Sequence, residues 1–209
     1  MRALLKDILD FRRFPWLYLA VVIAAGIATA SLTLRDALIF NRGDISHGEL
    51  WRIWTGHIVH FGWPHYVADG ALFLVIGWAL ERASPVCGRI SLFLLPLVVS
   101  ATIYWFEPTM NVYGGLSGVN VGLLVFMACR GWQKNWMDWF WPAILGIHVL
   151  EVLLEIHNHG TGGGAIRFDS PDIRVATMAH IGGAVYGVTA WGFLALRANR
   201  IRPPASETK

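Results

Sequence analysis

Two polar residues of the chain lie in strongly apolar surroundings and have the chemistry of a hydrolase. Ser117 lies in the stretch YGGLSGVNVGLL, and His180 lies in the stretch RVATMAHIGGAVYG. A serine hydroxyl is a weak nucleophile until a base takes its proton, and a neutral imidazole does this best near neutral pH. The two residues therefore predict a nucleophile and its general base, provided that the fold brings them together.

The glycines near these two residues have two uses. A glycine-rich turn can aim backbone N–H groups at a developing oxyanion, and the start of a helix favours negative charge there. Gly118 and Gly122 are four residues apart, as are Gly183 and Gly187, and small residues at this spacing let membrane helices approach closely. The alternative for each feature alone is an ordinary packing surface with a core histidine.

The composition places this chemistry in a membrane. Hydrophobic residues make up 55% of the 209 residues and charged residues only 15%, and the mean hydropathy is positive. This balance lies far outside the range of soluble domains. We therefore expect a lipid bilayer as a partner. The chain has no basic run interleaved with aromatic residues, which argues against nucleic acid as a partner.

Apolar runs of spanning length recur along the chain, and they predict an all-α membrane protein with a bundle of six transmembrane helices. The predicted spans are about Pro15–Leu34, His65–Leu80, Ile90–Phe106, Leu116–Cys129, Met137–Ile156 and Val175–Leu196. One domain is expected over residues 15–196. It would follow a cytoplasmic N-terminal segment, residues 1–14, and precede a cytoplasmic tail, residues 197–209.

The basic residues predict the orientation of the spans. Six spans leave both termini on one side, and most of the 17 lysine and arginine residues fall on that side. The positive-inside rule assigns this side to the cytoplasm. Ser117 then lies at the outer end of the fourth span, and His180 lies at a similar depth in the sixth. We expect the site to face the outer side of a bacterial plasma membrane.

Four short motifs carry a resemblance to a known family. They are G-x-S-G at Gly115, Leu116, Ser117 and Gly118; A-H-x-x-G at Ala179, His180 and Gly183; W-R at Trp51 and Arg52; and a second-helix histidine, His65. In these motifs the chain resembles the rhomboid intramembrane serine proteases. The resemblance implies a Ser117–His180 dyad, with the backbone of Ser117 and the side chain of His65 stabilising the oxyanion.

Within that family, the compact six-helix form and the stretch WRIWTGHIVHFGWPH are most similar to rhombosortases. Those relatives are thought to process proteins that end in Gly-Gly, an apolar helix and a basic tail. The resemblance therefore implies an endopeptidase that cleaves a single-span membrane substrate with a helical C-terminal tail. The alternative is a catalytically silent relative that binds membrane helices as an adaptor or chaperone. A transporter is disfavoured because no inverted repeat is evident.

Two positions depart from the family pattern. Asp69 stands where the family has asparagine, four residues after the second-helix histidine, and an ionised carboxylate there would repel an oxyanion. Asp69 therefore either carries a proton or orients that histidine from one helical turn away, and we favour the second role. Val121 stands where many members have an aromatic residue that stacks on the catalytic histidine. His180 would then be held by Tyr186, by Tyr113 or by packing glycines.

Three ionisable residues of the fifth predicted span, His148, Glu151 and Glu155, share one helical face. Ionisable groups inside a membrane are functional candidates. The two glutamates lie near the predicted depth of Ser117, so they would line a wet substrate gate or receive basic residues of a substrate. The alternative is that they are interfacial residues satisfied by water or by nearby polar groups.

The histidines also raise the question of a metal site. His57, His60 and His65 are close in sequence, and further histidines occur in HVLEVLLEIHNH. Neither stretch contains the H-E-x-x-H pattern of zinc proteases, and spacing alone is weak support. We therefore expect no metal and no other cofactor. We expect His60 to be a structural hydrogen-bonding residue beneath the first outer loop.

Overall fold

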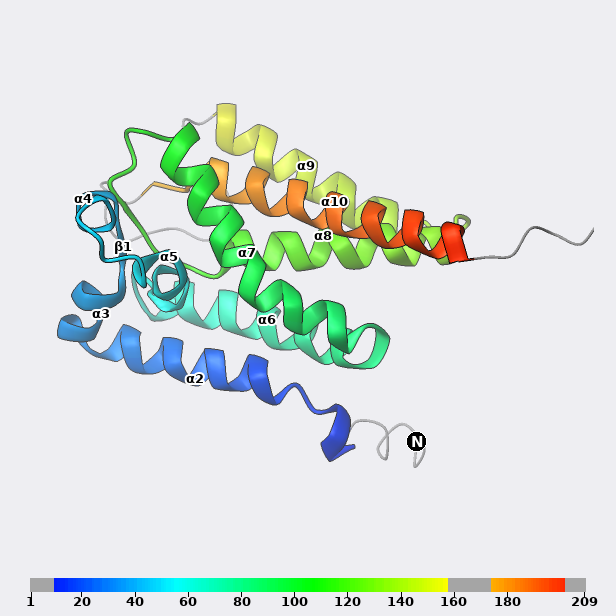
Figure 1. Cartoon of the computed structure of the whole chain (residues 1–209), viewed down its shortest axis with the longest axis horizontal. Coiled ribbons are helices and arrows are strands. Elements are labelled where there is room, and N and C mark those ends of the chain that lie inside the picture. Colours follow the sequence, from blue (N-terminus) through cyan, green and yellow to red (C-terminus); the bar gives the residue numbers. More distant parts are fainter. Residues whose placement is uncertain (1–9, 158–173, 202–209) are drawn as a thin grey trace, which may run out of the picture.

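The computed structural model describes residues 10–157 and 174–201, and this part of the chain is mostly helical, as predicted. Six helices of 15 residues or more form its bundle (Figure 1). They are α2 (Trp16–Ala30), α6 (Trp63–Ala83), α7 (Pro85–Phe106), α8 (Ser117–Lys134), α9 (Phe140–His157) and α10 (Thr177–Ile201). The shorter elements are η1 (Phe11–Arg13), α3 (Leu32–Leu38), β1 (Phe40–Asn41), α4 (Arg42–Ser46), α5 (Arg52–Thr55), η2 (Gly56–Ile58) and β2 (Val112–Tyr113).

The long helices differ in how well they suit a bilayer. By length and composition, α7, α9 and the part of α10 over Thr177–Ala198 can each cross a membrane. A fourth span results if α2 and α3, which meet at a bend of 116°, are counted together. The described residues thus support a membrane protein with three or four apolar spans. Six spans remain a prediction, which requires α6 and α8 to cross the membrane as well.

The first predicted span ends earlier than its apolar run. The helix α2 ends at Ala30, and the chain bends into α3 before it reaches Leu34. Ser31 explains the bend, because its backbone is extended and its hydroxyl accepts a hydrogen bond from the Leu34 N–H. This is an N-terminal cap, which starts a new helix in a new direction. Apolar residues continue through the bend, so hydropathy alone does not detect it.

The helix α8 is the centre of the bundle and contacts α6, α7, α9 and α10 (Figure 1). Its buried apolar side chains include Val119, Leu123 and Phe126. Asn120 is buried as well, and its Nδ2 donates a hydrogen bond to the backbone oxygen of Asp69 at 3.0 Å. A polar side chain in such a core needs a partner, and this one ties α8 to α6.

The backbones of α8 and α10 touch along a line of glycines. A Cβ atom on Gly118 would lie 2.9 Å from the carbonyl oxygen of Ala179, and one on Gly122 would lie 2.9 Å from that of Gly183. A Cβ atom on Gly183 would collide with the carbonyl oxygen of Gly118. We call this contact the glycine seam, formed by Gly118, Gly122, Gly183 and Gly187. It allows the close approach that the spacing of these glycines predicts.

The loop between α2 and α6 is held against the segment that leads to Ser117. β1 pairs antiparallel with β2, so that Phe40 faces Tyr113. The guanidinium of Arg42 donates hydrogen bonds to carbonyl oxygens at the end of α7 and in the turn beyond it. These oxygens belong to Ile103, Tyr104, Glu107 and Met110. The loop therefore holds the end of α7 and the approach to α8 in one piece.

Arg52 of the predicted W-R motif holds the same loop together through contacts with residues of the loop itself. Arg52 is buried, and its guanidinium pairs with Glu49 at 2.7 Å and with Asp44 at 3.2 Å. It also donates to the backbone oxygens of Asp36 and Ile39. A buried guanidinium needs several acceptors, and this one finds them across the whole loop. The role of Arg52 is therefore structural.

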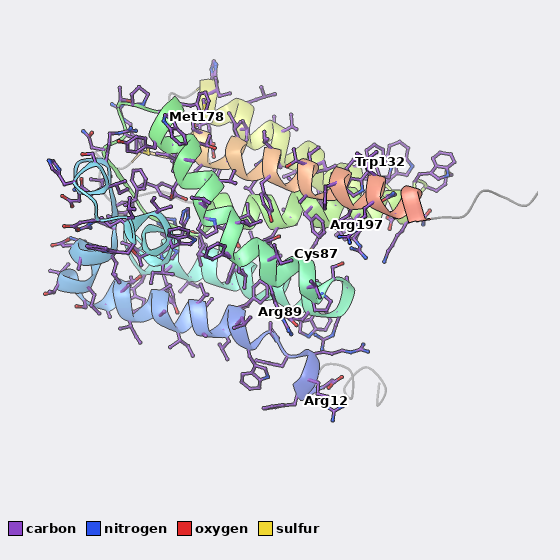
Figure 2. All side chains as sticks on the ribbon, in the orientation of Figure 1. Arg12, Cys87, Arg89, Trp132, Met178 and Arg197 are labelled. Atoms are coloured by element: carbon purple, nitrogen blue, oxygen red, sulfur yellow. The ribbon has the colours of Figure 1, made fainter. Side chains whose placement is uncertain are left out.

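The two ends of the bundle carry different residues. Figure 2 shows Arg12, Arg89 and Arg197 towards one end, and Met178, two residues before His180, at the other. At the arginine end, Arg89 pairs with the buried carboxylate of Glu81 at 2.7 Å. The residues of interest for chemistry thus lie at the end away from these basic side chains.

Candidate active site

Ser117 is the first residue of α8 and is half-buried. The turn before it contains Gly115 at a φ of +133°, a conformation that residues with a side chain rarely adopt. A Cβ atom on Gly115 would lie 2.9 Å from Nε2 of His65. Glycine therefore lets this turn press directly against His65. The first N–H groups of a helix have no acceptor within the helix, so the backbone at Ser117 can donate to an oxyanion.

Tyr113 supports this turn from the buried side. Its hydroxyl donates a hydrogen bond to the carbonyl oxygen of Gly115 at 3.0 Å. Burial raises the pKa of Tyr113, and the nearby charge of Asp69 raises it further. Hydrogen bonds of the hydroxyl with the Ser117 side chain and with the backbone of Gly118 oppose this rise in pKa. Tyr113 therefore keeps its proton and lies close to the serine.

His57 and Ser100 form a histidine–serine contact in the described part of the chain. Nε2 of His57 lies 3.0 Å from the Ser100 hydroxyl and 3.1 Å from the carbonyl oxygen of Pro96. Burial lowers the pKa of His57 to about 4, although hydrogen bonds to the backbone of Pro96 and Gly115 oppose the change. The Ser100 hydroxyl donates to the carbonyl oxygen of Ile53 at 2.8 Å. This contact therefore holds the outer loop on α7, and it does not activate Ser100.

Asp69 gathers three partners on one carboxylate oxygen. Its Oδ2 lies 3.2 Å from Nε2 of His65 and 3.3 Å from Nε2 of His60. The same oxygen accepts a hydrogen bond from the N–H of Leu116 at 2.9 Å. All four residues are buried. Asp69 therefore lies where it can orient His65, and it also fixes the residue before Ser117.

The same three side chains are also the described group that could hold a metal ion. One ligand atom from each of His60, His65 and Asp69 lies within 4.8 Å of the others. Two histidines and a carboxylate suit zinc. Hydrogen bonding accounts for the His65 side of the cluster, because that imidazole can donate Nε2–H to the carboxylate at 3.2 Å, whereas Nε2 of His60 lies 3.3 Å away without hydrogen-bond geometry. The Leu116 N–H on the same oxygen favours hydrogen bonding over a metal.

His180 lies in the first turn of α10 and is 6% exposed. Its Nδ1 lies 2.9 Å from Oε1 and 3.0 Å from Oε2 of Glu155. The ring of His148 meets the ring of His180 edge-on, with 6.4 Å between the centroids. Tyr186 was one candidate to hold His180, but its hydroxyl donates a hydrogen bond to Ser91 on α7 at 2.9 Å. The polar contacts that the structure shows for His180 come from α9, and the sequence did not predict them.

Ser117 and His180 lie at the same level on the two sides of the glycine seam. Gly118, which follows Ser117, contacts Ala179, which precedes His180. The residues next to Ser117 and His180 are thus in contact, on helices whose backbones touch. A hydrogen bond between the serine hydroxyl and the imidazole remains a prediction.

Comparison with known proteins agrees with this geometry. A family model described as a rhomboid domain matches residues 47–198, which include α5 to α10 with Ser117, His180 and His65. The chain belongs to the rhomboid family. It is similar to Rhomboid-related protein 1 of Caenorhabditis elegans, with 29% identity over 147 residues. That match takes in 68% of this chain and 39% of the relative, so the chain spans about two fifths of the relative's length.

Rhomboids are in general serine proteases that act inside membranes, and the family includes inactive members. Family membership therefore places this rhomboid in a lipid bilayer. It does not by itself decide activity. Whether this rhomboid is active depends on the residues around Ser117.

A cavity of about 730 Å³ opens beside the serine of this rhomboid. Its lining includes Ser117, His65 and Tyr113, together with the carboxylates Glu107 and Glu155. Burial raises the pKa of Glu107, and the charge of Glu155 raises it further, against the opposing effect of the Met178 backbone. The volume lies in the range of sites that enclose ligands. The serine and the oxyanion candidate thus share one space that a peptide segment could enter.

The remaining predicted site residues fall into two groups. Gly115, Leu116 and Gly118 form the turn and the seam at Ser117, as described above. Glu155 lies against His180 and lines the cavity, whereas the side chain of Glu151 lies outside the described residues. The loop that contains residues 158–173 also lies outside them. The gate role of the two glutamates remains a prediction.

Three residues near the site were not predicted from the sequence. Asn120 ties α8 to Asp69, Glu107 adds a carboxylate to the cavity, and Arg42 fastens the turn between them. The signal for Asn120 was available, because an asparagine in an apolar helix is unusual and needs a partner. Glu107 follows the end of α7 and Arg42 begins the short helix α4, and hydropathy gives no signal of this kind at either place.

Proposed function

We propose that this rhomboid is an intramembrane serine endopeptidase with Ser117 as the nucleophile and His180 as the general base. The observation that carries the proposal is that both residues lie at one level of the glycine seam, beside a cavity that Ser117 lines. His180 presents Nδ1 to a carboxylate, and Nε2 is the ring nitrogen proposed to take the serine proton.

In the proposed reaction, Oγ of Ser117 attacks the carbonyl carbon of the scissile peptide bond. Nε2 of His180 takes the serine proton and then gives it to the departing amine. Water attacks the resulting acyl-enzyme with His180 again acting as the base, which releases the acid and restores the serine. All three steps use one imidazole and one hydroxyl, so loss of either side chain should stop the reaction.

The oxyanion would be stabilised by the N–H of Ser117 and by His65, with Asp69 in a supporting role. If Nε2 of His65 donates to Asp69, only the doubly protonated ring has a second N–H left to donate. An ionised Asp69 at 3.2 Å stabilises that cation. An asparagine could accept the same hydrogen bond but could not supply the charge. We therefore propose that Asp69 orients His65 and supplies a negative charge beside it.

We further propose that both termini are cytoplasmic and that the site faces the outer side of a bacterial plasma membrane. The arginines seen away from Met178 in Figure 2 support this orientation through the positive-inside rule. The protease domain is proposed to span residues 15–196, because α2 packs on α6 although the family match begins later. Maleimide labelling of single cysteines placed in α4 and after Lys134, in a cysteine-free background, tests the orientation in intact cells.

The proposed substrate is a single-span exported protein with Gly-Gly, an apolar helix and a basic tail at its C-terminus. The stretch WRIWTGHIVHFGWPH, which resembles rhombosortases, supports this choice. The test is a reporter protein with such a tail, compared with a matched reporter in which both glycines are changed to valine. Cleavage of the first reporter alone is expected, and equal cleavage of both would overturn the tail preference while leaving proteolysis intact.

The central experiment is labelling of the purified protein by a fluorophosphonate, which reacts with activated serines. We expect labelling of the wild-type protein and none of Ser117→Ala or His180→Ala. Ser100→Ala is the matched control, because it removes the other histidine-bound serine and should still be labelled. A wild-type protein that is folded but neither labelled nor proteolytic would instead indicate a silent helix-binding relative. A chelator should leave labelling unchanged, since no metal is proposed.

A further inference from the structure

The contact between Glu155 and His180 joins two helices across the outer half of the bundle. Nδ1 of His180 lies 2.9 Å and 3.0 Å from the two carboxylate oxygens of Glu155. Both side chains are buried, at 6% and 8% exposure. A buried carboxylate is unfavourable unless it is paired and hydrogen-bonded, so this contact accounts for the presence of Glu155 in the core.

The helix α9 turns its polar residues inward and its apolar residues outward. Among its side chains that the structure describes, the buried ones are His148 and Glu155. The apolar Val149, Leu150 and Leu153 are each 56% exposed. Apolar side chains suit lipid, so α9 exposes these three and buries the two polar residues that meet His180. Seven residues, or about two helical turns, separate His148 from Glu155, which puts them on one face.

An acceptor at Nδ1 decides which nitrogen of the ring can act as a base. A carboxylate accepts but does not donate, so neutral His180 carries its proton on Nδ1 and keeps the lone pair on Nε2. This is the tautomer that a serine nucleophile requires. When Nε2 takes the serine proton, the ring becomes a cation, and the carboxylate next to it stabilises that charge.

We propose that Glu155 is a positioning residue that completes a Ser117–His180–Glu155 triad in this protein. The inference rests on the proposed function, and it assigns to Glu155 a task different from a substrate gate. Glu155 holds the imidazole in the required tautomer and orientation through Nδ1–H. It keeps its negative charge throughout, because the proton travels only between Ser117, Nε2 of His180 and the departing amine. His148 supports the same ring from its edge, at the place where Val121 provides no aromatic face.

The test compares Glu155→Gln and Glu155→Asp with the wild-type protein. Replacing the triad carboxylate by an amide in a soluble serine protease reduces kcat by about 10⁴-fold. In this partly solvated site we expect Glu155→Gln to lower kcat by roughly 10²-fold or more, with KM changed by less than about threefold. Fluorophosphonate labelling should slow in parallel. Glu155→Asp keeps the charge on a shorter stem, and it should recover a measurable part of both rates.

The matched control is Glu81→Gln, which removes the buried carboxylate that pairs with the exposed Arg89 at the other end of the bundle. Thermal unfolding of every variant is measured in the same detergent. The control should lose stability but keep its kcat. If Glu155→Gln loses activity only in step with its stability, as the control does, the contact is structural and the proposal is wrong.

Two other outcomes would also overturn the triad. A rise in KM with kcat unchanged would show that Glu155 receives a basic residue of the substrate. Activity of Glu155→Gln within threefold of wild type would show that a dyad suffices. Failure of the proposed function has a different signature, because wild-type protein and Ser117→Ala would then be equally unlabelled.

Discussion

The glycine seam and the helix α9 hold the two sides of His180 in opposite ways. At the seam, carbonyl oxygens of one helix lie where the side chains of the other would begin, and substitution is blocked by backbone. On α9, the fully buried side chains among the described residues are those of His148 and Glu155, and most of the helix is exposed. The seam contact is made by backbone atoms at a fixed distance, whereas the contact between α9 and His180 is made by long side chains.

This difference indicates how the site divides its tasks. The distance between the proposed nucleophile and the proposed base is set by rigid packing, because both residues flank a contact that cannot be adjusted without moving a helix. The carboxylate reaches His180 from a helix with few buried contacts, so its position depends on that hydrogen bond. Small changes at the seam should therefore affect fold and activity together, and changes on α9 should affect activity first.

The largest effect is expected from Gly183→Ala. The new Cβ atom would collide with the carbonyl oxygen of Gly118, and helix backbone cannot yield as a flexible side chain can. We expect a loss of about 2 kcal/mol or more in unfolding free energy and a loss of labelling of at least about tenfold, since a misplacement of 1 Å can cost 10²-fold. Thermal unfolding and fluorophosphonate labelling, both in detergent, measure the two effects.

Two glycines outside the seam provide matched controls for that change. Gly192 on the same helix and Gly146 on α9 have open space where a Cβ atom would be added. Alanine is the better helix former, so either change should alter stability by less than about 1 kcal/mol. Similar losses at all three glycines would contradict the distinction between the seam and α9.

Asp69→Asn should produce the next largest effect. It keeps an acceptor near His65 and the N–H of Leu116 but removes the charge from the centre of three contacts. We expect kcat to fall by about tenfold to 10²-fold, the range of one lost electrostatic contribution to the oxyanion. Steady-state cleavage of the reporter at several pH values provides the measurement. Full activity at every pH would mean that the charge has no catalytic task.

His148→Leu should have a smaller effect, and it examines the α9 side alone. The substitution removes the edge contact to His180 but leaves Glu155 in place. We expect kcat to fall by about three- to tenfold, since an aromatic contact contributes about 0.5–1.5 kcal/mol. Ile147→Leu, one residue away and 64% exposed, is the control and should leave kcat unchanged. A larger loss than that of Glu155→Gln would reverse the assigned order of importance.

The smallest effect on activity at neutral pH is expected at His57, where the expected result is a pH dependence of stability. Its folded-state pKa of about 4 lies below the ordinary value of 6.5, so protonation favours the unfolded state. The stabilising contribution is complete above pH 6.5, decreases as the pH falls towards 4, and is then constant. The total change is at most about 3 kcal/mol. Unfolding of wild type and His57→Gln at pH 7, 6, 5 and 4 should converge as the pH falls.

The sequence predicted the positions of the long helices of this protein better than the turns between helices. Apolar runs located α6 to α10 to within a few residues, because spanning length is itself the signal. The end of α2 differed because a single hydroxyl, that of Ser31, decides the turn there. Such a cap involves a few atoms, whereas hydropathy averages over many residues.

The site could be predicted where its geometry follows from one helix or one turn. His65 and Asp69 face each other because they are four residues apart on α6, and the structure finds 3.2 Å between them. The sequence also put His148 and Glu155 on one face of α9. It could not identify His180 as their partner, because the register between α9 and α10 is set by packing between helices and not by spacing along the chain.

The single guanidinium of Arg42 reaches carbonyl oxygens on both sides of the bend that follows α7. A planar fork with fixed donor directions accepts little change in the spacing of what it binds. Insertions and deletions should therefore be poorly tolerated between Ile103 and Met110, even though this bend is a surface connection of the kind that usually varies in length. Arg42 thus fixes the length and shape of the bend that leads from α7 towards Ser117, the proposed nucleophile.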